Sequence, residues 1–331
     1  MNSIGTIFRV SIFGESHGPA LGVIIDGCPP GIEFSEQDME NDIKRRMPGA
    51  AGTTPRREPD VPEIISGVFN GRTTGAPLTI LFRNSDARSG DYERFKTVPR
   101  PGHADFTAMK KYRGFNDHRG GGHFSGRITL GLVAAGALAK KVINTITVDA
   151  KILEIAGEKD YEETLEKIAS DGDSAGGIIE VRMSGVPAGL GEPFFNSFES
   201  CISHLVFSVP AVKGIEFGSG FVSARMKGSE HNDIIISPDG KTLTNNSGGI
   251  NGGISNGNEI VFRVAVKPTP SIKMEQETVN VATGELENLN IHGRHDACIA
   301  LRVPVILEAC AAIAAADLHL IRKINNQMEY K

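Results

Sequence analysis

The chain has 331 residues, a net charge of −5 and 40 % hydrophobic residues, an ordinary composition for a globular protein of one or two domains. The mild acidic excess argues against bulk nucleic-acid binding, and the longest apolar stretch, residues 128–139, is too short to cross a bilayer. No secretory signal opens the chain, and the four cysteines are widely spaced, without the pattern of a disulfide framework or a zinc ribbon. We therefore expect a cytoplasmic protein without a membrane partner.

Hydrophobic periodicity and turn residues predict interleaved strands and helices. In chain order we expect strands 6–13 and 20–26, helix 35–47, strands 63–69 and 78–82, helices 104–112 and 127–142, strand 147–156, helix 161–169, strand 178–186, helix 198–207, strands 214–217 and 259–266, and helix 305–324. Residues 245–257 are expected to form turns. Since the chain shows no repeat, no linker and no strict strand–helix–strand rhythm, the sequence favours an α+β fold.

Glycine is unusually frequent, with 39 residues or about 12 % against a typical ~7 %. Glycine collects where the backbone approaches a ligand or takes a positive φ. Glycines accompany polar clusters in four separate places: 14–18, 45–60, 100–127, and 267–271 with 293–298. Loops beside regular elements often carry function, so these segments are the candidate site.

Two histidines follow or precede glycine in such loops. His17 lies in a break between two predicted strands, and His103 immediately precedes a predicted helix. Because the ordinary pKa of histidine is ~6.5, either residue is suited to proton transfer near neutral pH. The alternatives are that His17 is a surface turn residue and that Asp105, beside His103, only stabilises the helix start.

Arginine is concentrated near the first predicted helix. Arg45 and Arg46 end that helix, and Arg56 and Arg57 follow a short loop. Guanidinium groups bind phosphate or carboxylate in bidentate fashion, so this cluster indicates an anionic substrate if it faces a pocket. Ordinary solvent exposure is the alternative.

The glycine run 119–127 resembles a phosphate-binding loop but lacks the Gly-Lys-Ser/Thr ending of a P-loop. An RNA-binding interpretation of this run is the alternative. Near the end of the chain, His292, His295 and Cys298 have a spacing that metal ligands can adopt, but a fourth ligand is not evident and neighbouring arginine would repel a cation. Asp296 is either an arginine-paired carboxylate or a base.

Taken together, these segments resemble the chorismate synthase family. The resemblance covers nearly the whole chain, in the order 13–18 with 29–32, 45–60, 86–92, 100–105, 120–129, 213–221, 246–255, 267–271 and 293–298. It implies a single-domain β-α-β sandwich over residues 1–331 that assembles as a homotetramer. The implied activity is a shikimate-pathway lyase, which converts 5-enolpyruvylshikimate 3-phosphate to chorismate and phosphate by anti-1,4-elimination with reduced FMN and no net redox change.

The resemblance also assigns roles by motif position. His17 matches the residue that protonates the departing phosphate, His103 the residue that protonates or stabilises the reduced flavin, and Asp296 the carboxylate that assists deprotonation. The substrate-binding positions are Arg46, Arg57, Arg127 and Arg294, with Arg45 as an addition. The flavin-binding positions are His123, Phe124, Ser125, Pro210, Ala211, Gly252, Lys267, Pro268, Thr269, Pro270, Ser271 and Arg294.

Arg46 also coincides with a family position for NADPH, yet no dinucleotide fingerprint is present, which favours a separate flavin reductase. The chain departs from the family at His123 and Phe124, which replace a common Arg-Ser pair, at Gly52, which stands near a usual arginine, and at Ala297, which replaces a common proline. Two other functions remain open: a flavin-dependent oxidoreductase acting on an anionic metabolite, and a binder of phosphometabolites or RNA without catalysis.

Overall fold

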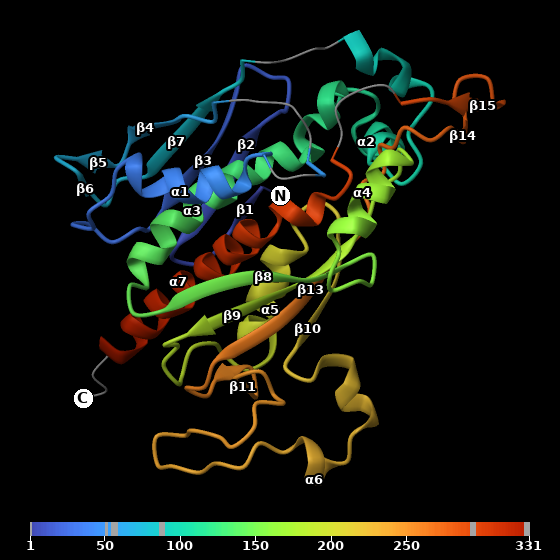
Figure 1. Ribbon diagram of the computed structural model, residues 1–331. Coiled ribbons are helices and arrows are strands. Elements are labelled where there is room, and N and C mark those ends of the chain that lie inside the picture. Colours follow the sequence, from blue (N-terminus) through green and yellow to red (C-terminus); the bar gives the residue numbers. More distant parts are fainter. Residues whose placement is uncertain (1, 50–51, 54–58, 86–89, 292–295, 328–331) are drawn as a thin grey trace.

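Two antiparallel sheets enclose a layer of helices (Figure 1). The protein is represented by a computed structural model, which describes residues 2–49, 52–53, 59–85, 90–291 and 296–327. Buried hydrophobic side chains from both sheets and from the helices between them form one continuous cluster. The α+β prediction and the sandwich arrangement are therefore confirmed.

The first sheet has the strand order β1-β2-β3-β7-β4 and is antiparallel throughout. Its strands are β1 (Ser3–Ile4), β2 (Arg9–Gly14), β3 (Ala20–Asp26), β4 (Pro62–Ser66) and β7 (Leu78–Arg83). Side chains alternate between the faces of a strand, and alternate residues Leu21, Val23 and Ile25 are all buried. They pair with the buried residues of β7, with Val23 opposite Ile80. This face therefore covers the helical layer.

The second sheet has the order β10-β13-β9-β8 and is also antiparallel. Its strands are β8 (Thr147–Ile155), β9 (Gly177–Ser184), β10 (Val212–Phe217) and β13 (Ile260–Val266). Val181 and Phe262 are paired and fully buried. Three small hairpins complete the strands: β5 (Val68–Phe69) with β6 (Arg72–Thr73), β11 (Ile250–Asn251) with β12 (Ile254–Ser255), and β14 (Gln276–Val279) with β15 (Leu286–Leu289).

Four helices lie between the sheets: α1 (Gln37–Arg46), α3 (Thr129–Val142), α5 (Phe198–Val206) and α7 (Pro304–Gln327). Helix α3 packs on β2, β3 and α1, whereas α7 packs on α5, β8 and β9. The remaining helices are α2 (Asp105–Tyr112), α4 (Glu162–Ser170) and α6 (Gly228–His231), and the 3-10 helices are η1 (Gly90–Lys96), η2 (Arg119–Phe124), η3 (Gly126–Ile128), η4 (Phe194–Asn196), η5 (Gly220–Arg225) and η6 (Ile299–Arg302).

Helices α3 and α7 meet along small side chains at the centre of the molecule. A Cβ placed on Gly136 would lie 2.3 Å from Cβ of Ala309, so the helices leave no space for a methyl group there. By length and composition alone, 304–326 of α7 could span a membrane, but 78 % of its most apolar window is buried in the fold. The apolar composition of α7 is therefore explained by its position in the core of the sandwich.

Three differences from the predicted elements have local causes. Residues 6–8 are not strand, because the Asp317 carboxylate of α7 accepts the backbone N–H groups of all three. The predicted strand 63–69 breaks at Gly67, which has φ +86° and lies against the backbone of Leu78. The turn segment 245–257 contains the hairpin β11–β12.

Candidate active site

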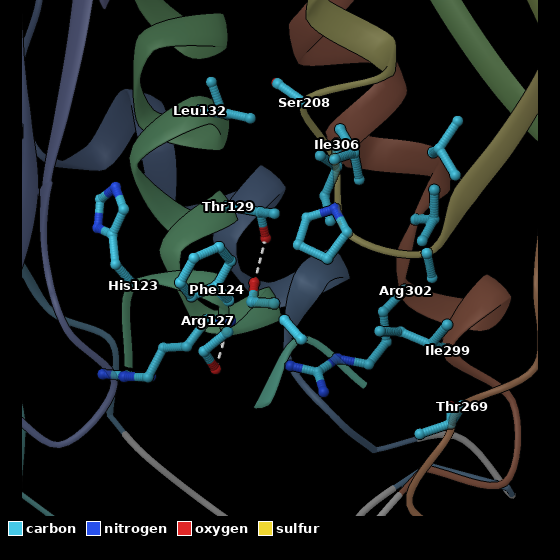
Figure 2. A pocket seen from close by; sticks show the side chains of 18 of the residues that line it. His123, Phe124, Arg127, Thr129, Leu132, Ser208, Thr269, Ile299, Arg302 and Ile306 are labelled. Carbon is cyan, nitrogen blue, oxygen red and sulfur yellow. Dashed lines mark hydrogen bonds between the residues drawn. The ribbon is translucent and has the colours of Figure 1, made fainter. Parts of the chain in front are cut away.

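A cavity of about 700 Å³ lies where α3 and α7 begin and where α5 ends. Apolar side chains such as Leu132, Ile299 and Ile306 line part of it, and polar side chains line the rest (Figure 2). The amino ends of helices carry partial positive charge and exposed N–H groups, which favour anions. Two such ends therefore face a space of the size typical for ligand sites.

Most of the predicted site residues meet in this cavity, although they come from six separate segments. Those that line it are Arg46, His103, His123, Phe124, Ser125, Arg127, Pro210, Ala211, Lys267, Thr269, Pro270, Ser271 and Asp296. The loop 267–271 is tied to the loop before α2, because Lys267 Nζ donates to the Gly102 carbonyl at 2.6 Å and Arg100 Nη1 donates to Ser271 Oγ at 3.1 Å.

The other predicted residues lie elsewhere. Gly252 is exposed between β11 and β12, and Pro268 belongs to the 267–271 loop without lining the cavity. Arg57 and Arg294 lie outside the described residues, as do the predicted metal candidates His292 and His295.

Arg45 and Arg46 point in different directions although they are adjacent. Arg45 does not line the cavity; its Nη1 and Nη2 bind the Glu308 carboxylate at 2.7 and 2.6 Å. Lys140 Nζ joins this group through Glu308 and Asp42, at 3.3 and 2.7 Å. We call Asp42, Arg45, Lys140 and Glu308 the helix-layer cluster. Its contacts explain Arg45 as a structural residue, so we leave Arg45 out of the substrate site.

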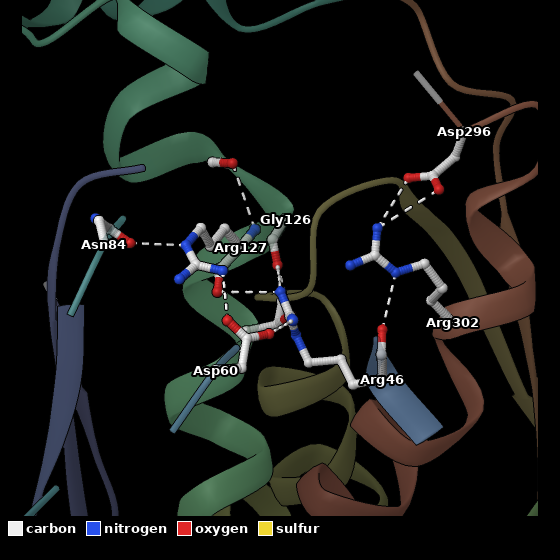
Figure 3. Close-up of polar contacts among 9 residues, drawn as sticks. Arg46, Asp60, Asn84, Gly126, Arg127, Asp296 and Arg302 are labelled. Carbon is white, nitrogen blue, oxygen red and sulfur yellow. Dashed lines mark hydrogen bonds and ion pairs between the residues drawn. The ribbon is translucent and has the colours of Figure 1, made fainter. Parts of the chain in front are cut away.

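Arg46 faces the cavity in a second group of charges (Figure 3). Its Nη1 lies 3.2 Å from Asp60 Oδ2, and Arg127 Nη1 lies 2.7 Å from Asp60 Oδ1. Arg302 Nη1 binds Asp296 Oδ2 at 3.1 Å, and Arg302 Nε donates to the Arg46 carbonyl at 2.9 Å. We call Arg46, Asp60, Arg127, Asp296 and Arg302 the cavity cluster. Three guanidinium groups share two carboxylates, an excess of one positive charge among these five residues.

That excess acts on Arg46, whose side chain is only 3 % exposed. Burial and the repulsion from Arg302 and Arg127 lower the pKa of Arg46 to about 9, although Asp60 and Asp296 act in the opposite direction. Arg46 therefore remains charged at neutral pH but lacks enough nearby negative charge. An anionic ligand would supply that charge.

His17 is buried directly behind the cavity wall. Its ring packs edge-on against Tyr92, with centroids 5.1 Å apart, and a Cβ on Gly120 would lie 2.1 Å from His17 Nδ1. Gly120 and Tyr92 line the cavity, whereas His17 does not. Glycines 120–122 all have positive φ, and Gly122 accepts the backbone N–H of Ser16 at 3.1 Å. The glycine run thus packs two loops together, which is a different role from the phosphate binding that its composition resembles.

His123 occupies the position where the family resemblance predicts a flavin-side arginine. Its Nδ1 lies 2.7 Å from the Gly14 carbonyl, and its Nε2 lies 3.2 Å from Asn2 Oδ1. Because a carbonyl oxygen only accepts, Nδ1 carries a hydrogen. The ring thus joins η2 to β2 and to the start of the chain.

The cavity residues that sequence reasoning missed include Asp60, Tyr92 and Arg302. Asp60 and Tyr92 lie in segments 45–60 and 86–92, which sequence reasoning had selected. The local sequence does not indicate which arginines form ion pairs with Asp60. Arg302 belongs to no motif, and its partners Asp296 and Arg46 become visible only in the fold. The sequence did indicate that Arg46 is buried, because it lies three residues after Ile43 and seven after Met39. This spacing places it on the apolar, buried face of α1.

Comparisons with known proteins agree with this geometry. A family model described as Chorismate synthase matches residues 8–320. A chorismate synthase of Chitinophaga pinensis is 59 % identical over 329 residues, covering 99 % of both chains, and one of Methanosarcina mazei is 46 % identical, covering 97 % of this chain and 96 % of that protein. The chain belongs to the chorismate synthase family.

A solved structure titled "Crystal Structure of Chorismate Synthase" superposes with a TM-score of 0.74 at 26 % identity and covers 96 % of this chain and 93 % of that one. The fold is therefore that of the chorismate synthase family, as the resemblance implied. Chorismate synthases are lyases of the shikimate pathway, which form chorismate by eliminating phosphate from 5-enolpyruvylshikimate 3-phosphate. The chain is accordingly an enzyme of aromatic biosynthesis that acts on a small anionic substrate.

Proposed function

We propose that the cavity holds 5-enolpyruvylshikimate 3-phosphate and reduced FMN together, and that phosphate elimination takes place there. The observation that carries this proposal is the cavity cluster, where three guanidinium groups meet two carboxylates among the described residues. A polyanionic substrate is the ligand that such a deficit favours.

Arg46 and Arg127 are the proposed substrate anchors, together with Arg57 from the family resemblance. Asp60 binds both anchors through its two oxygens, and Arg127 Nε also donates to Asn84 Oδ1 at 2.8 Å. Fixing both groups before binding removes part of the entropy cost of holding the anion. Asp296, bound to Arg302, is the proposed base.

The cavity's residues fit a flavin. Apolar side chains such as Leu132 and Ile306 suit a planar aromatic ring, while Lys267 and the helix ends suit a phosphate. The proposed contacts are His123, Phe124, Ser125, Pro210, Ala211 and the loop 267–271, with Gly252 and Arg294 from the family resemblance. When bound, reduced FMN would supply and recover an electron, so that elimination proceeds without net redox change.

The histidines would move protons. His17 is the proposed donor to the departing phosphate, and His103 is the proposed donor or stabiliser at the flavin. His103 lines the cavity, but Gly120 and Tyr92 separate His17 from it. The proposal therefore requires Gly120 or Tyr92 to shift when substrate binds, so that His17 reaches the cavity.

We also propose a single domain over residues 1–331, a cytoplasmic location, a homotetramer and supply of reduced flavin by a separate NADPH-dependent reductase. The continuous core supports the single domain. Phe194 and Phe195 are 87 % and 94 % exposed, which supports burial against further subunits. Arg46 is the proposed substrate anchor, which argues against a further role for it in binding NADPH.

The deciding experiment is an anaerobic assay with purified protein, chemically reduced FMN and the phosphorylated substrate. We expect phosphate and chorismate in equal amounts with no net consumption of reductant. Stoichiometric oxidation of the flavin would instead indicate an oxidoreductase. Binding of substrate without turnover, unaltered in His17→Ala and His103→Ala, would indicate a binding protein.

A further inference from the structure

A carboxylate two residues along the chain orients His103. Asp105 is the first residue of α2, and its Oδ1 lies 2.6 Å from His103 Nδ1. The Asp105 side chain is 6 % exposed, so water competes little for it. Arg100 holds the same carboxylate, with Nε 2.8 Å from Oδ2 and Nη2 2.9 Å from Oδ1.

Asp105 is ionised in this arrangement. Burial alone would raise the pKa of Asp105, but the hydrogen bonds from Arg100 and His103, with their charges, outweigh it and hold that pKa well below its usual range. An ionised carboxylate accepts hydrogen bonds and cannot donate them. The hydrogen in the 2.6 Å contact therefore belongs to Nδ1 of His103.

A second contact to the same nitrogen has to be reconciled with this assignment. Arg100 Nη2 lies 3.0 Å from His103 Nδ1. If Nδ1 accepted from Arg100, its lone pair would face an ionised oxygen at 2.6 Å, which is repulsive. The shorter contact decides the hydrogen position, and Arg100 Nη2 donates to Asp105 at 2.9 Å.

Among the described residues, no group is hydrogen-bonded to the other ring nitrogen of His103, Nε2. Nε2 and Cε1 lie 3.6 Å from the position that a Cβ would take on Gly121, an ordinary contact distance. His103 itself lines the cavity, where Nε2 is the nitrogen that a ligand could bind. Arg100 also reaches Ser271 in the proposed flavin loop, so the imidazole and that loop share one anchor.

We propose that Asp105, held by Arg100, is a positioning residue that keeps a hydrogen on Nδ1 of His103, so that His103 exchanges its proton with the bound flavin through Nε2 alone. The proton exchange between His103 and the flavin rests on the proposed function, whereas the position of the hydrogen on the His103 ring does not. In the donating step the Nε2–H bond breaks, the proton passes to the ligand, and the ring becomes neutral with Nδ1–H retained. The Asp105 charge stabilises the protonated ring before this step.

The test uses the full-length protein labelled with ¹⁵N-histidine, without ligand, at a pH where ordinary histidines are neutral. Nitrogen chemical shifts and couplings report which ring nitrogen carries the hydrogen. We expect Nδ1–H for His103 in the unmodified protein and a shift toward Nε2–H, the form preferred by free histidine, in Asp105→Ala. His123 is an internal control, because its Nδ1 is bound to Gly14 and not to Asp105.

An unchanged Nδ1–H form of His103 in Asp105→Ala would overturn the proposal, provided that the His123 signals show an intact fold. Asp105→Asn is the milder variant, since its amide oxygen still accepts a hydrogen bond from Nδ1 but carries no charge. In that variant we expect kcat with reduced FMN to fall ~10-fold or more. A kcat equal to that of the unmodified protein would also overturn the proposal.

These outcomes are separable from those of the proposed function. If the anaerobic assay yields no chorismate while Asp105→Ala still changes the ring hydrogen, the flavin role fails and the positioning role stands. If chorismate forms and the ring hydrogen is indifferent to Asp105, the positioning role fails and the enzymatic function stands.

Discussion

Two clusters of charged side chains include residues from the last turns of the same short helix, α1, and they differ in charge balance. The helix-layer cluster has two cations and two carboxylates, all bound to one another. The cavity cluster has three guanidinium groups and two carboxylates. Among the described residues, the charges of the first cluster balance, and the second has one positive charge more than it has carboxylates.

This difference separates structural charges from binding charges. Removing one partner from a buried, balanced cluster leaves an uncompensated charge and costs stability. Removing a cation from the unbalanced cluster leaves two guanidinium groups for its two carboxylates, so its main cost is affinity. Arg45 and Arg46 are adjacent in the chain, yet Arg45 belongs to the structural charges and Arg46 to the binding charges.

The largest expected effect is on folding. Glu308→Ala should lower the free energy of unfolding by ~3–5 kcal/mol, because Arg45 and Lys140 lose a buried partner and the Ala150 N–H loses its acceptor. Urea denaturation measures this loss. Glu308→Gln, with the same shape, is the matched control for volume. A loss below ~1 kcal/mol would show that the helix-layer cluster is not structural.

The next effect is on substrate affinity. Arg46→Ala should weaken binding of 5-enolpyruvylshikimate 3-phosphate by ~1.5–3 kcal/mol, about 10-fold to 150-fold, because a buried charge-assisted contact is lost. Isothermal titration calorimetry gives the dissociation constant. Arg46→Lys keeps the charge and should recover only part of the affinity, since the bidentate geometry is lost. Equal affinity in all three proteins would remove Arg46 from the site.

A third effect is the pH dependence of affinity. Since the pKa of Arg46 is lowered to about 9, substrate affinity should fall as the pH rises through that value, by at most tenfold per unit. Folding stability depends on pH in the opposite direction. The unfolded chain holds this proton more tightly, so the destabilisation of the fold by the buried charge is complete below pH ~9 and is relieved as the pH rises above that value. Titrations from pH 7.5 to 10 measure the affinity, and a flat profile would contradict the assignment.

The smallest expected effect comes from Arg45. Arg45→Gln should leave substrate affinity unchanged, because its guanidinium binds Glu308 and does not line the cavity. Its side chain is 40 % exposed and Glu308 keeps its ion pair with Lys140, so the loss of stability should be smaller than that of Glu308→Ala. The same calorimetry and denaturation experiments apply. A large loss of affinity would place Arg45 back among the substrate residues.

Much of the fold was predictable because local patterns carry it. The alternation in β13 and the apolar periodicity of α7 gave elements within one to three residues of those observed. Residues 6–8 were wrongly predicted as strand because Asp317, which binds their N–H groups, lies more than 300 positions away. Local patterns do not contain such a partner.

The site was predictable only in part, for the same reason. Residue types and glycine spacing marked the segments with Arg46, His103 and Asp296, which do line one cavity. The pairing of Asp60 with two arginines and of Arg302 with Asp296 depends on tertiary structure. The position of His17 behind Gly120 likewise follows from how two loops pack.

The contact between Gly136 and Ala309 has a mechanical consequence for the site. These residues lie within the two central helices, α3 and α7, which directly follow the 3-10 helices η3 and η6 that bear Arg127 and Arg302. Because the contact leaves no space for even one carbon atom, the two helices are held rigidly against each other. The distance between Arg127 and Arg302 is therefore set before a ligand binds. A larger side chain at position 136 would push α3 and α7 apart, although it lies far from the proposed ligand-binding groups. The distance between the arginines would then increase, and anion binding would weaken although no binding residue had been replaced.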